Sequence, residues 1–447
     1  MMPNHSDQII LVNGLILADP DSCLVVPHGK TVIKGNMLSE VNSQLEAPPF
    51  SSEVIDCSNC LIMPGLVNAH THAAMSLLRG LADDLPLDKW LNDCIFPSEA
   101  KHVGPEFVFL GTSLSAVEMA LGGITTFADG YFFMEKAADA AAEVGLRAVI
   151  AQGILDVPSP DCPDPAKWNK RIEEFFARFP ESPLTRPALF CHSPYLCGPE
   201  TFRIAKKLAA DHGTLLFAHI SETRCEVEEI ASRFGKTPLE HVHDLGILDR
   251  NFVNVHCVHL SDHEKDILAD SGAGVVHCPE SNMKLASGAC PTRDLLKRGT
   301  SVAIGTDGPA SNNNLDIFEE MRSAALMAKL VTSDPEALDA RSVLRMATIQ
   351  GAQVLGLDHS IGSLKAGKLA DLIVIDLDRP HLTPVFDPVS HLVYCARGSD
   401  VRDVIVNGRI VVRDGSIITI DYSELASQVR SFAAKIAADL GIRTELK

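Results

Sequence analysis

Short apolar runs alternate with amphipathic segments through the middle of the chain, and this alternation predicts strand–helix units in series. The predicted strands span residues 61–67, 123–128, 147–151, 188–191, 215–218, 252–255, 274–276 and 302–306. Helical segments lie between them, such as the one that starts at Ser261, where Ser261 and Glu264 have the spacing of a capping box. Eight units of this kind predict an α/β fold, a (β/α)8 TIM barrel.

The two ends of the chain have a different pattern, with short strands joined by polar turns. Residues 8–12 form an apolar run closed by Asn13-Gly14, and similar runs return at 370–376 and 403–412. We expect residues 1–60 and 361–447 to combine into one small β-sandwich beside a catalytic barrel of residues 61–360. A last amphipathic helix is predicted over residues 422–440.

Polar side chains recur where the predicted barrel strands end. In chain order they are His70, His72, Asp129, His192, His219, His256, His277 and Asp307. One such histidine alone is typical of a satisfied core residue, but the C-terminal ends of barrel strands converge on one mouth, so the repeated position favours a shared site. His70 and His72 are two positions apart on a strand and point the same way, which suits a transition metal.

Composition and charge narrow the function classes. The chain has 447 residues, is 46% hydrophobic and carries a net charge of -19, which disfavours nucleic acid and anionic membrane surfaces as partners. Residues 1–8 lack the features of a secretory signal, and no apolar stretch approaches the ~18 residues of a spanning helix, so we expect a cytoplasmic protein. Cys57 and Cys60 form a single C-x-x-C, interpreted as coincidence because no second pair follows.

The chain contains the runs PGLVNAHTHAAMSLLRGLADDLPLDKWL, CHSPY, AHISE, VHCVHL, HCPESNMKLASG and GTDGPASNN. These resemble the amidohydrolase superfamily and, within it, the 5′-methylthioadenosine/S-adenosylhomocysteine deaminases. The resemblance implies hydrolytic deamination at C6 of a small-molecule nucleoside, 5′-methylthioadenosine or possibly S-adenosylhomocysteine or adenosine. It also implies one divalent metal per subunit, expected to be zinc, with the ligands His70, His72, His219 and Asp307. Superfamily members commonly form oligomers, so a homo-oligomer is left open.

The resemblance also implies roles for individual residues. Glu222, three positions after a metal ligand, matches a proton shuttle to the purine ring, and Asp307 is placed to accept a proton from water. His256 fits a residue that polarises the attacking oxygen. Glu99 matches a carboxylate that accepts both ribose hydroxyls, and His192, which stands where a carbamylated lysine would bridge two metals, matches a contact to purine or ribose. Glu222 and Asp307 are expected to contact substrate as well.

Alternative functions remain open. Related amidohydrolases act on guanine, oxidised purines, cytosine or triazines with nearly the same metal ligands. A non-catalytic barrel or a structural zinc protein predicts missing ligands or a four-cysteine site, and the sequence has neither feature.

The sequence after the third predicted strand bears on substrate preference. Members of the resembled family that accept the homocysteine tail carry an arginine there for its carboxylate, whereas this chain has Gln152. We therefore expect 5′-methylthioadenosine to be preferred over S-adenosylhomocysteine. Arg171 is either a substitute for the missing arginine or a solvated helix residue.

Overall fold

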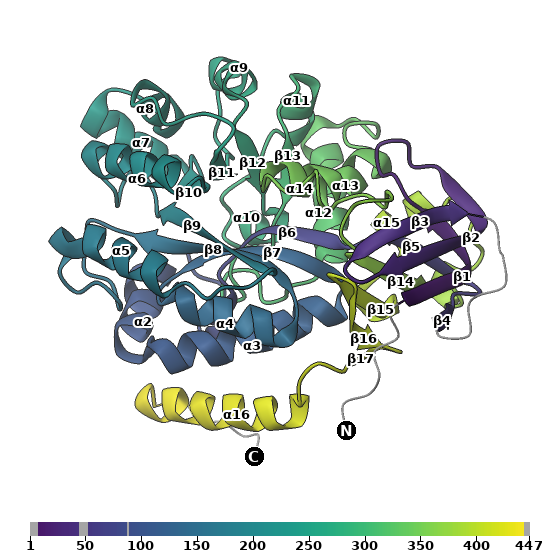
Figure 1. Cartoon of the computed structure of the whole chain (residues 1–447). Coiled ribbons are helices and arrows are strands. Elements are labelled where there is room, and N and C mark those ends of the chain that lie inside the picture. The colour runs from purple at the N-terminus through teal and green to yellow at the C-terminus, as the bar shows by residue number, and fades with distance from the viewer. Residues whose placement is uncertain (1–7, 44–51, 87–88, 442–447) are drawn as a thin grey trace.

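The computed structural model describes residues 8–43, 52–86 and 89–441, and these form a barrel and a separate mixed sheet (Figure 1). Eight parallel strands pair in chain order, and a bridge between Thr71 and Asp307 joins the last strand region to the first. The barrel strands are β6 (Leu66–Thr71), β7 (Ile124–Tyr131), β8 (Arg147–Ile154), β9 (Thr185–Cys191), β10 (Leu216–Ile220), β11 (Phe252–His256), β12 (Gly274–His277) and β13 (Val302–Ile304). The predicted (β/α)8 barrel is confirmed.

Helices follow the barrel strands and cover the outside of the barrel (Figure 1). The capping box predicted at Ser261 and Glu264 is present at the start of α9. The α-helices are α2 (Phe96–His102), α3 (Pro105–Leu121), α4 (Met134–Val144), α5 (Trp168–Arg178), α6 (Pro199–Asp211), α7 (Arg224–Phe234), α8 (Pro238–Asp244), α9 (Asp262–Ser271), α10 (Pro279–Lys284), α11 (Thr292–Lys297), α12 (Ile317–Thr332), α13 (Ala340–Met346), α14 (Ile349–Val354), α15 (Pro388–Tyr394) and α16 (Tyr422–Asp439). None of the helices among the described residues is long and apolar enough to cross a bilayer.

Both ends of the chain contribute to the second sheet, as predicted. Its N-terminal strands are β1 (Gln8–Leu17), β2 (Val25–Lys34), β3 (Met37–Ser43), β4 (Glu53–Asp56) and β5 (Cys60–Pro64). Its C-terminal strands are β14 (Leu372–Asp376), β15 (Val401–Val406), β16 (Arg409–Arg413) and β17 (Ser416–Ile417). The two halves meet where β14 pairs antiparallel with β5. Of residues 1–8, which were expected to lack a secretory signal, residues 1–7 lie outside the described residues.

One predicted strand is wrong. Residues 61–67 do not form one barrel strand, because β5 ends at Pro64 in the second sheet and β6 begins at Leu66 in the barrel. Gly65 lies between them, packed so tightly that an added Cβ would stand 2.0 Å from Oγ1 of Thr125. Only glycine allows this close passage from one sheet to the other. His70 consequently lies inside β6 rather than after a strand.

The last helix lies against the barrel exterior. Helix α16 runs beside α3 (Figure 1). The rings of Phe432 in α16 and Phe107 in α3 meet edge to face with centroids 5.9 Å apart. This confirms the helix predicted near the C-terminus, which ends one residue earlier than expected.

Candidate active site

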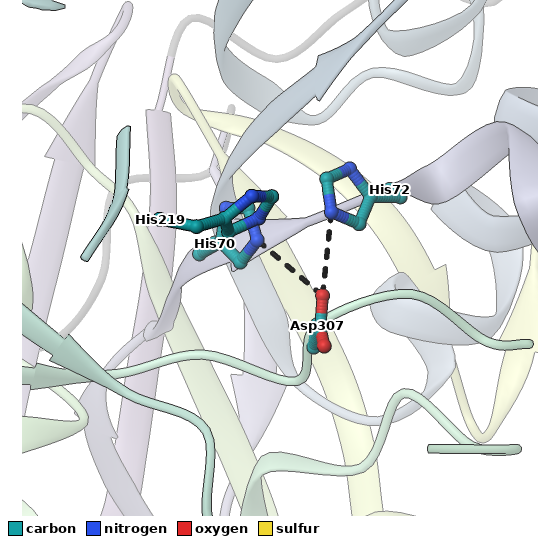
Figure 2. Close-up of side chains that lie close together, drawn as sticks. All are labelled: His70, His72, His219 and Asp307. Atoms are coloured by element: carbon teal, nitrogen blue, oxygen red, sulfur yellow. Dashed lines mark ion pairs between the residues drawn. The ribbon is translucent and has the colours of Figure 1, made fainter. Parts of the chain in front are cut away.

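Four side chains from distant segments meet at one mouth of the barrel (Figure 2). His70 lies in β6, His72 follows that strand, His219 lies in β10 and Asp307 follows β13. One ligand atom from each lies within 4.8 Å of all the others. Within residues 8–43, 52–86 and 89–441 this is the only such group of three or more histidines, cysteines or carboxylates. The structure therefore contains a His/Asp metal-binding site.

The carboxylate of Asp307 is oriented by contacts on both oxygens. Its Oδ1 lies 3.4 Å from Nε2 of His70 and 3.3 Å from Nε2 of His72 (Figure 2). Its Oδ2 accepts hydrogen bonds from the hydroxyls of Ser281 at 2.6 Å and Ser311 at 3.0 Å. Oδ1 thus faces the two imidazoles, while the hydrogen bonds to Oδ2 fix the orientation of the carboxylate. Neither serine was predicted from the sequence.

The protonation of the histidines fits a divalent metal. Nε2 of His70 is buried without a hydrogen-bond partner, and burial lowers the pKa of His70 to about 4. Nδ1 of His72 lies 2.5 Å from the carbonyl oxygen of Gly130, which keeps the proton on Nδ1 and leaves Nε2 with a free lone pair. Burial also lowers the pKa of His219 well below its usual value. Neutral imidazoles with one carboxylate are a donor set that suits zinc and similar ions.

The backbone turns sharply where several site residues leave their strands. Asp307, His256 and Ser221 have φ angles of 58°, 75° and 54°, in the left-handed region. Residues other than glycine are strained there, and such strain is concentrated at functional sites. The amide of Asp307 donates to the carbonyl of His70 at 3.1 Å, which fixes this turn against β6.

Glu222 and His256 lie next to each other in the mouth. Nε2 of His256 is 3.6 Å from Oε2 of Glu222, and Nδ1 of His256 is 3.1 Å from the side-chain amide of Asn282. Burial, and then the charge of Asp307, raise the pKa of Glu222 to about 8. A carboxyl with this pKa holds a proton at neutral pH and can pass it to a neighbour. Asn282 was not identified from the sequence.

Glu99, on helix α2, also lies at the mouth of the barrel. It is buried, and the hydroxyl of Tyr131 donates to its Oε1 at 2.5 Å. Burial raises the pKa of Glu99 to about 7, while the Tyr131 contact opposes the rise. Tyr131 was also missed, although it stands two residues after Asp129 at the end of the second barrel strand.

The remaining polar residues at the strand ends differ in position. His192 follows β9, its ring lies 4.9 Å from that of His219, and burial lowers its pKa to about 3. His277 is buried and is not among the residues that line the cavity. Asp129 also lies outside the lining and accepts the amide of Ala73 at 2.9 Å, so it supports the turn after β6.

The mouth opens into a cavity of about 480 Å³, large enough for a nucleoside. Of the residues predicted for the site, all but His70 line it: His72, Glu99, His192, His219, Glu222, His256 and Asp307. His70 is fully buried beneath them, against the ring of Phe190 at 5.6 Å. Gln152 and Arg171 do not line the cavity.

Comparisons with known proteins agree with this geometry. A model of the amidohydrolase family matches residues 61–411. A 5-methylthioadenosine/S-adenosylhomocysteine deaminase of Syntrophobacter fumaroxidans is 45% identical over 437 residues, which cover 97% of this chain and 100% of that protein. A 5′-deoxyadenosine deaminase of Methanothermobacter thermautotrophicus is 42% identical over 440 residues, 97% of this chain and 100% of its own. The solved structure of an adenosine deaminase from Xanthomonas campestris with bound zinc has a TM-score of 0.93 at 36% identity, covering 96% of this chain and 98% of that one.

Proposed function

The chain belongs to the amidohydrolase family, and we propose that it is a metal-dependent deaminase of 5′-methylthioadenosine and related adenine nucleosides. Water replaces the amino group at C6 of the purine, which leaves the inosine analogue and ammonia. One observation carries this conclusion: a His/Asp metal-binding site and two buried carboxyl groups, Glu222 and Glu99, face a single nucleoside-sized cavity. Relatives over nearly the full chain length carry the same activity in their names.

The proposed cofactor is a single zinc ion per chain. His70, His72, His219 and Asp307 would hold it. Nε2 of His70, which is buried without a hydrogen-bond partner and lies 3.4 Å from Oδ1 of Asp307, supports this assignment. When bound, the ion supplies Lewis-acid chemistry, lowering the pKa of a water from about 15.7 to about 7. His192 stands at the end of β9, where a lysine would be needed to bridge a second metal. The similar structure from Xanthomonas campestris contains zinc, which supports the choice of ion.

The chain's own residues then move the protons. Asp307 accepts a proton as water attacks C6, and Glu222 donates one to ring N1 so that the ring can accept electron density. Asp307 then returns its proton to N6, and the C6–N6 bond breaks as ammonia leaves. Glu222 takes up the proton of the C6 hydroxyl, which becomes the carbonyl of the inosine analogue, so both carboxyl groups return to their starting states. His256, fixed through Asn282, directs Nε2 toward the oxygen that attacks C6 and stabilises the charge that develops on it.

Binding of the sugar is assigned to the other polar groups in the cavity. Glu99, held by Tyr131, would accept the two ribose hydroxyls, and His192 would contact the purine or ribose. This carboxylate favours a nucleoside over a free base or a triazine, which have no ribose for Glu99 to bind. All four metal-site residues are present, which argues against a non-catalytic barrel.

The test is a substrate panel with the metal-loaded protein. We expect ammonia release from 5′-methylthioadenosine, with weaker or no release from guanine, cytosine and a triazine, and loss of activity after chelation that zinc restores. Release from guanine or a triazine in preference to every adenine nucleoside would contradict the proposed function.

A further inference from the structure

One wall of the cavity is formed by residues 155–163, which follow strand β8 and which we call the wall segment. The members that line the cavity are Leu155, Val157, Pro158, Ser159, Pro160 and Pro163. Apart from one serine hydroxyl, these side chains are apolar. Among the described residues that line the cavity there is no lysine and no arginine.

The wall segment begins beside the group assigned to the ribose. Tyr131, which donates to Glu99, pairs in register with Gln152 on the neighbouring strand. A nucleoside with C6 at the metal-binding site and its ribose hydroxyls on Glu99 has one group left to place, the substituent on the 5′ carbon. This group would therefore lie against the wall segment, an assignment that rests on the proposed function.

A cation that contacts the wall segment, Arg171 of helix α5, is already bound to other groups. Its Nε donates to Asp161 Oδ2 at 3.0 Å, and its Nη2 donates to Glu135 at 2.7 Å and to Gln152 at 3.0 Å. The side chain is only 9% exposed. Asp161 also accepts the amide of Phe133 at 2.9 Å and the side-chain amide of Gln152 at 2.9 Å. Arg171 thus neutralises two carboxylates and anchors the wall segment through Asp161.

We propose that this cavity selects adenine nucleosides with a short, uncharged 5′ substituent and discriminates against the homocysteine tail of S-adenosylhomocysteine. Arg171 is a positioning residue in this scheme, because it holds the wall segment and is not a ligand for the tail. The physical reason is the missing partner: the tail's carboxylate would lie against an apolar wall that offers no cation, so it would lose part of its hydration without gaining an ion pair.

The first test compares kcat/KM for 5′-methylthioadenosine, 5′-deoxyadenosine and S-adenosylhomocysteine with the zinc-loaded protein. We expect S-adenosylhomocysteine to be about 10–100-fold poorer than 5′-methylthioadenosine, the value of a missing ion pair. Equal or better turnover of S-adenosylhomocysteine would overturn the selectivity and leave the proposed function standing. Failure of all three nucleosides to react would instead refute the proposed function.

The second test separates the two roles of Arg171. If the arginine bound the tail, Arg171→Met would lower kcat/KM for S-adenosylhomocysteine selectively. We expect the ratio of kcat/KM for S-adenosylhomocysteine to that for 5′-methylthioadenosine not to fall. KM for 5′-methylthioadenosine should rise because the wall segment is held less firmly, while kcat is largely kept. In Arg171→Lys, KM for 5′-methylthioadenosine should lie between the values of the parent and Arg171→Met. A selective loss of about 10-fold for S-adenosylhomocysteine would show that Arg171 reads the carboxylate.

The third test adds the missing charge to the wall. Val157 lines the cavity and is 40% exposed, so an arginine there can reach both the tail and solvent. Val157→Arg should raise the ratio of kcat/KM for S-adenosylhomocysteine to that for 5′-methylthioadenosine by about 10-fold, whereas Val157→Met should not. An equal change in both variants would contradict the role of charge.

Discussion

The two ends of the cavity are built from different parts of the fold. At the metal end, His70, His219 and His256 lie on barrel strands and Asp307 follows a strand, so backbone pairing fixes their positions. At the loop end, Glu99 comes from a short helix and the wall segment is a connection without regular structure of its own over most of its length. The difference suggests a division of labour in which the strands carry the chemistry and the loops select the substrate.

The strongest test of this division removes a ligand at the metal end. His219→Ala should abolish both metal binding and turnover, because the remaining three groups leave the ion incompletely held. Metal content per chain and ammonia release measure the two effects. The exposed His263 on α9 provides the control, since His263→Ala should change neither. Full activity in His219→Ala would contradict the assignment of the chemistry to the metal end of the cavity.

The next largest effect is expected at Glu222. Glu222→Gln should keep the metal and leave KM nearly unchanged while kcat falls by about 10²–10⁴-fold, because the amide cannot donate the proton that the carboxyl would supply in the proposed mechanism. Steady-state kinetics with 5′-methylthioadenosine check this. Glu228→Gln, on the exposed face of α7, should behave as the parent does. An unchanged kcat would remove Glu222 from the proton transfer.

At the loop end the loss should appear in KM. Glu99→Gln should lower kcat/KM for 5′-methylthioadenosine by about 10–100-fold, the value of hydrogen bonds to a charged group. Burial raises the pKa of Glu99 to about 7, so the ionised form, which in the proposal accepts both ribose hydroxyls, accumulates as pH rises. The parent's KM should therefore fall as pH increases through about 7.

The control for this pH effect is the variant itself. In Glu99→Gln the fall of KM near pH 7 should disappear, while Glu106→Gln, an exposed position on α3, should retain it. A pH profile of KM that is identical in the parent and in Glu99→Gln would exclude titration of this carboxyl as the cause.

The smallest predicted effect concerns Tyr131, which bridges the two ends from strand β7 to Glu99. Tyr131→Phe removes one hydrogen bond and keeps the ring, so kcat/KM for 5′-methylthioadenosine should fall by about 3–10-fold, mostly through KM. Metal content should stay the same. A loss confined to kcat would show that Tyr131 acts in the chemical step at the metal end, and it would contradict its assignment to substrate binding.

The contrast between the two ends also explains what the sequence could predict. A strand can be predicted from a short apolar run of neighbouring residues, and a polar residue at the end of a barrel strand lies at the barrel mouth. His219 and Asp307 could therefore be assigned to the mouth from the sequence. The error at 61–67 arose because hydrophobicity continues across Gly65, where the chain leaves one sheet and enters the other.

The supporting contacts could not be predicted in this way. Ser281 reaches Asp307 across 26 residues, and Asn282 reaches His256 across the same separation. Hydroxyl and amide groups have no periodic signature, so their partners depend on how loops fold over the barrel. For the same reason the expectation that Arg171 is a solvated helix residue is wrong: it is buried, and its pairing with Asp161 and Glu135 depends on the path of the wall segment.

The most direct test of the central claim is a zinc titration of metal-free protein followed by deamination of 5′-methylthioadenosine. The proposed mechanism predicts no activity without metal, a linear rise as zinc is added, and a plateau at one zinc per chain. Activity that is full without metal, or that requires a second zinc per chain, would contradict a single metal centre formed by His70, His72, His219 and Asp307.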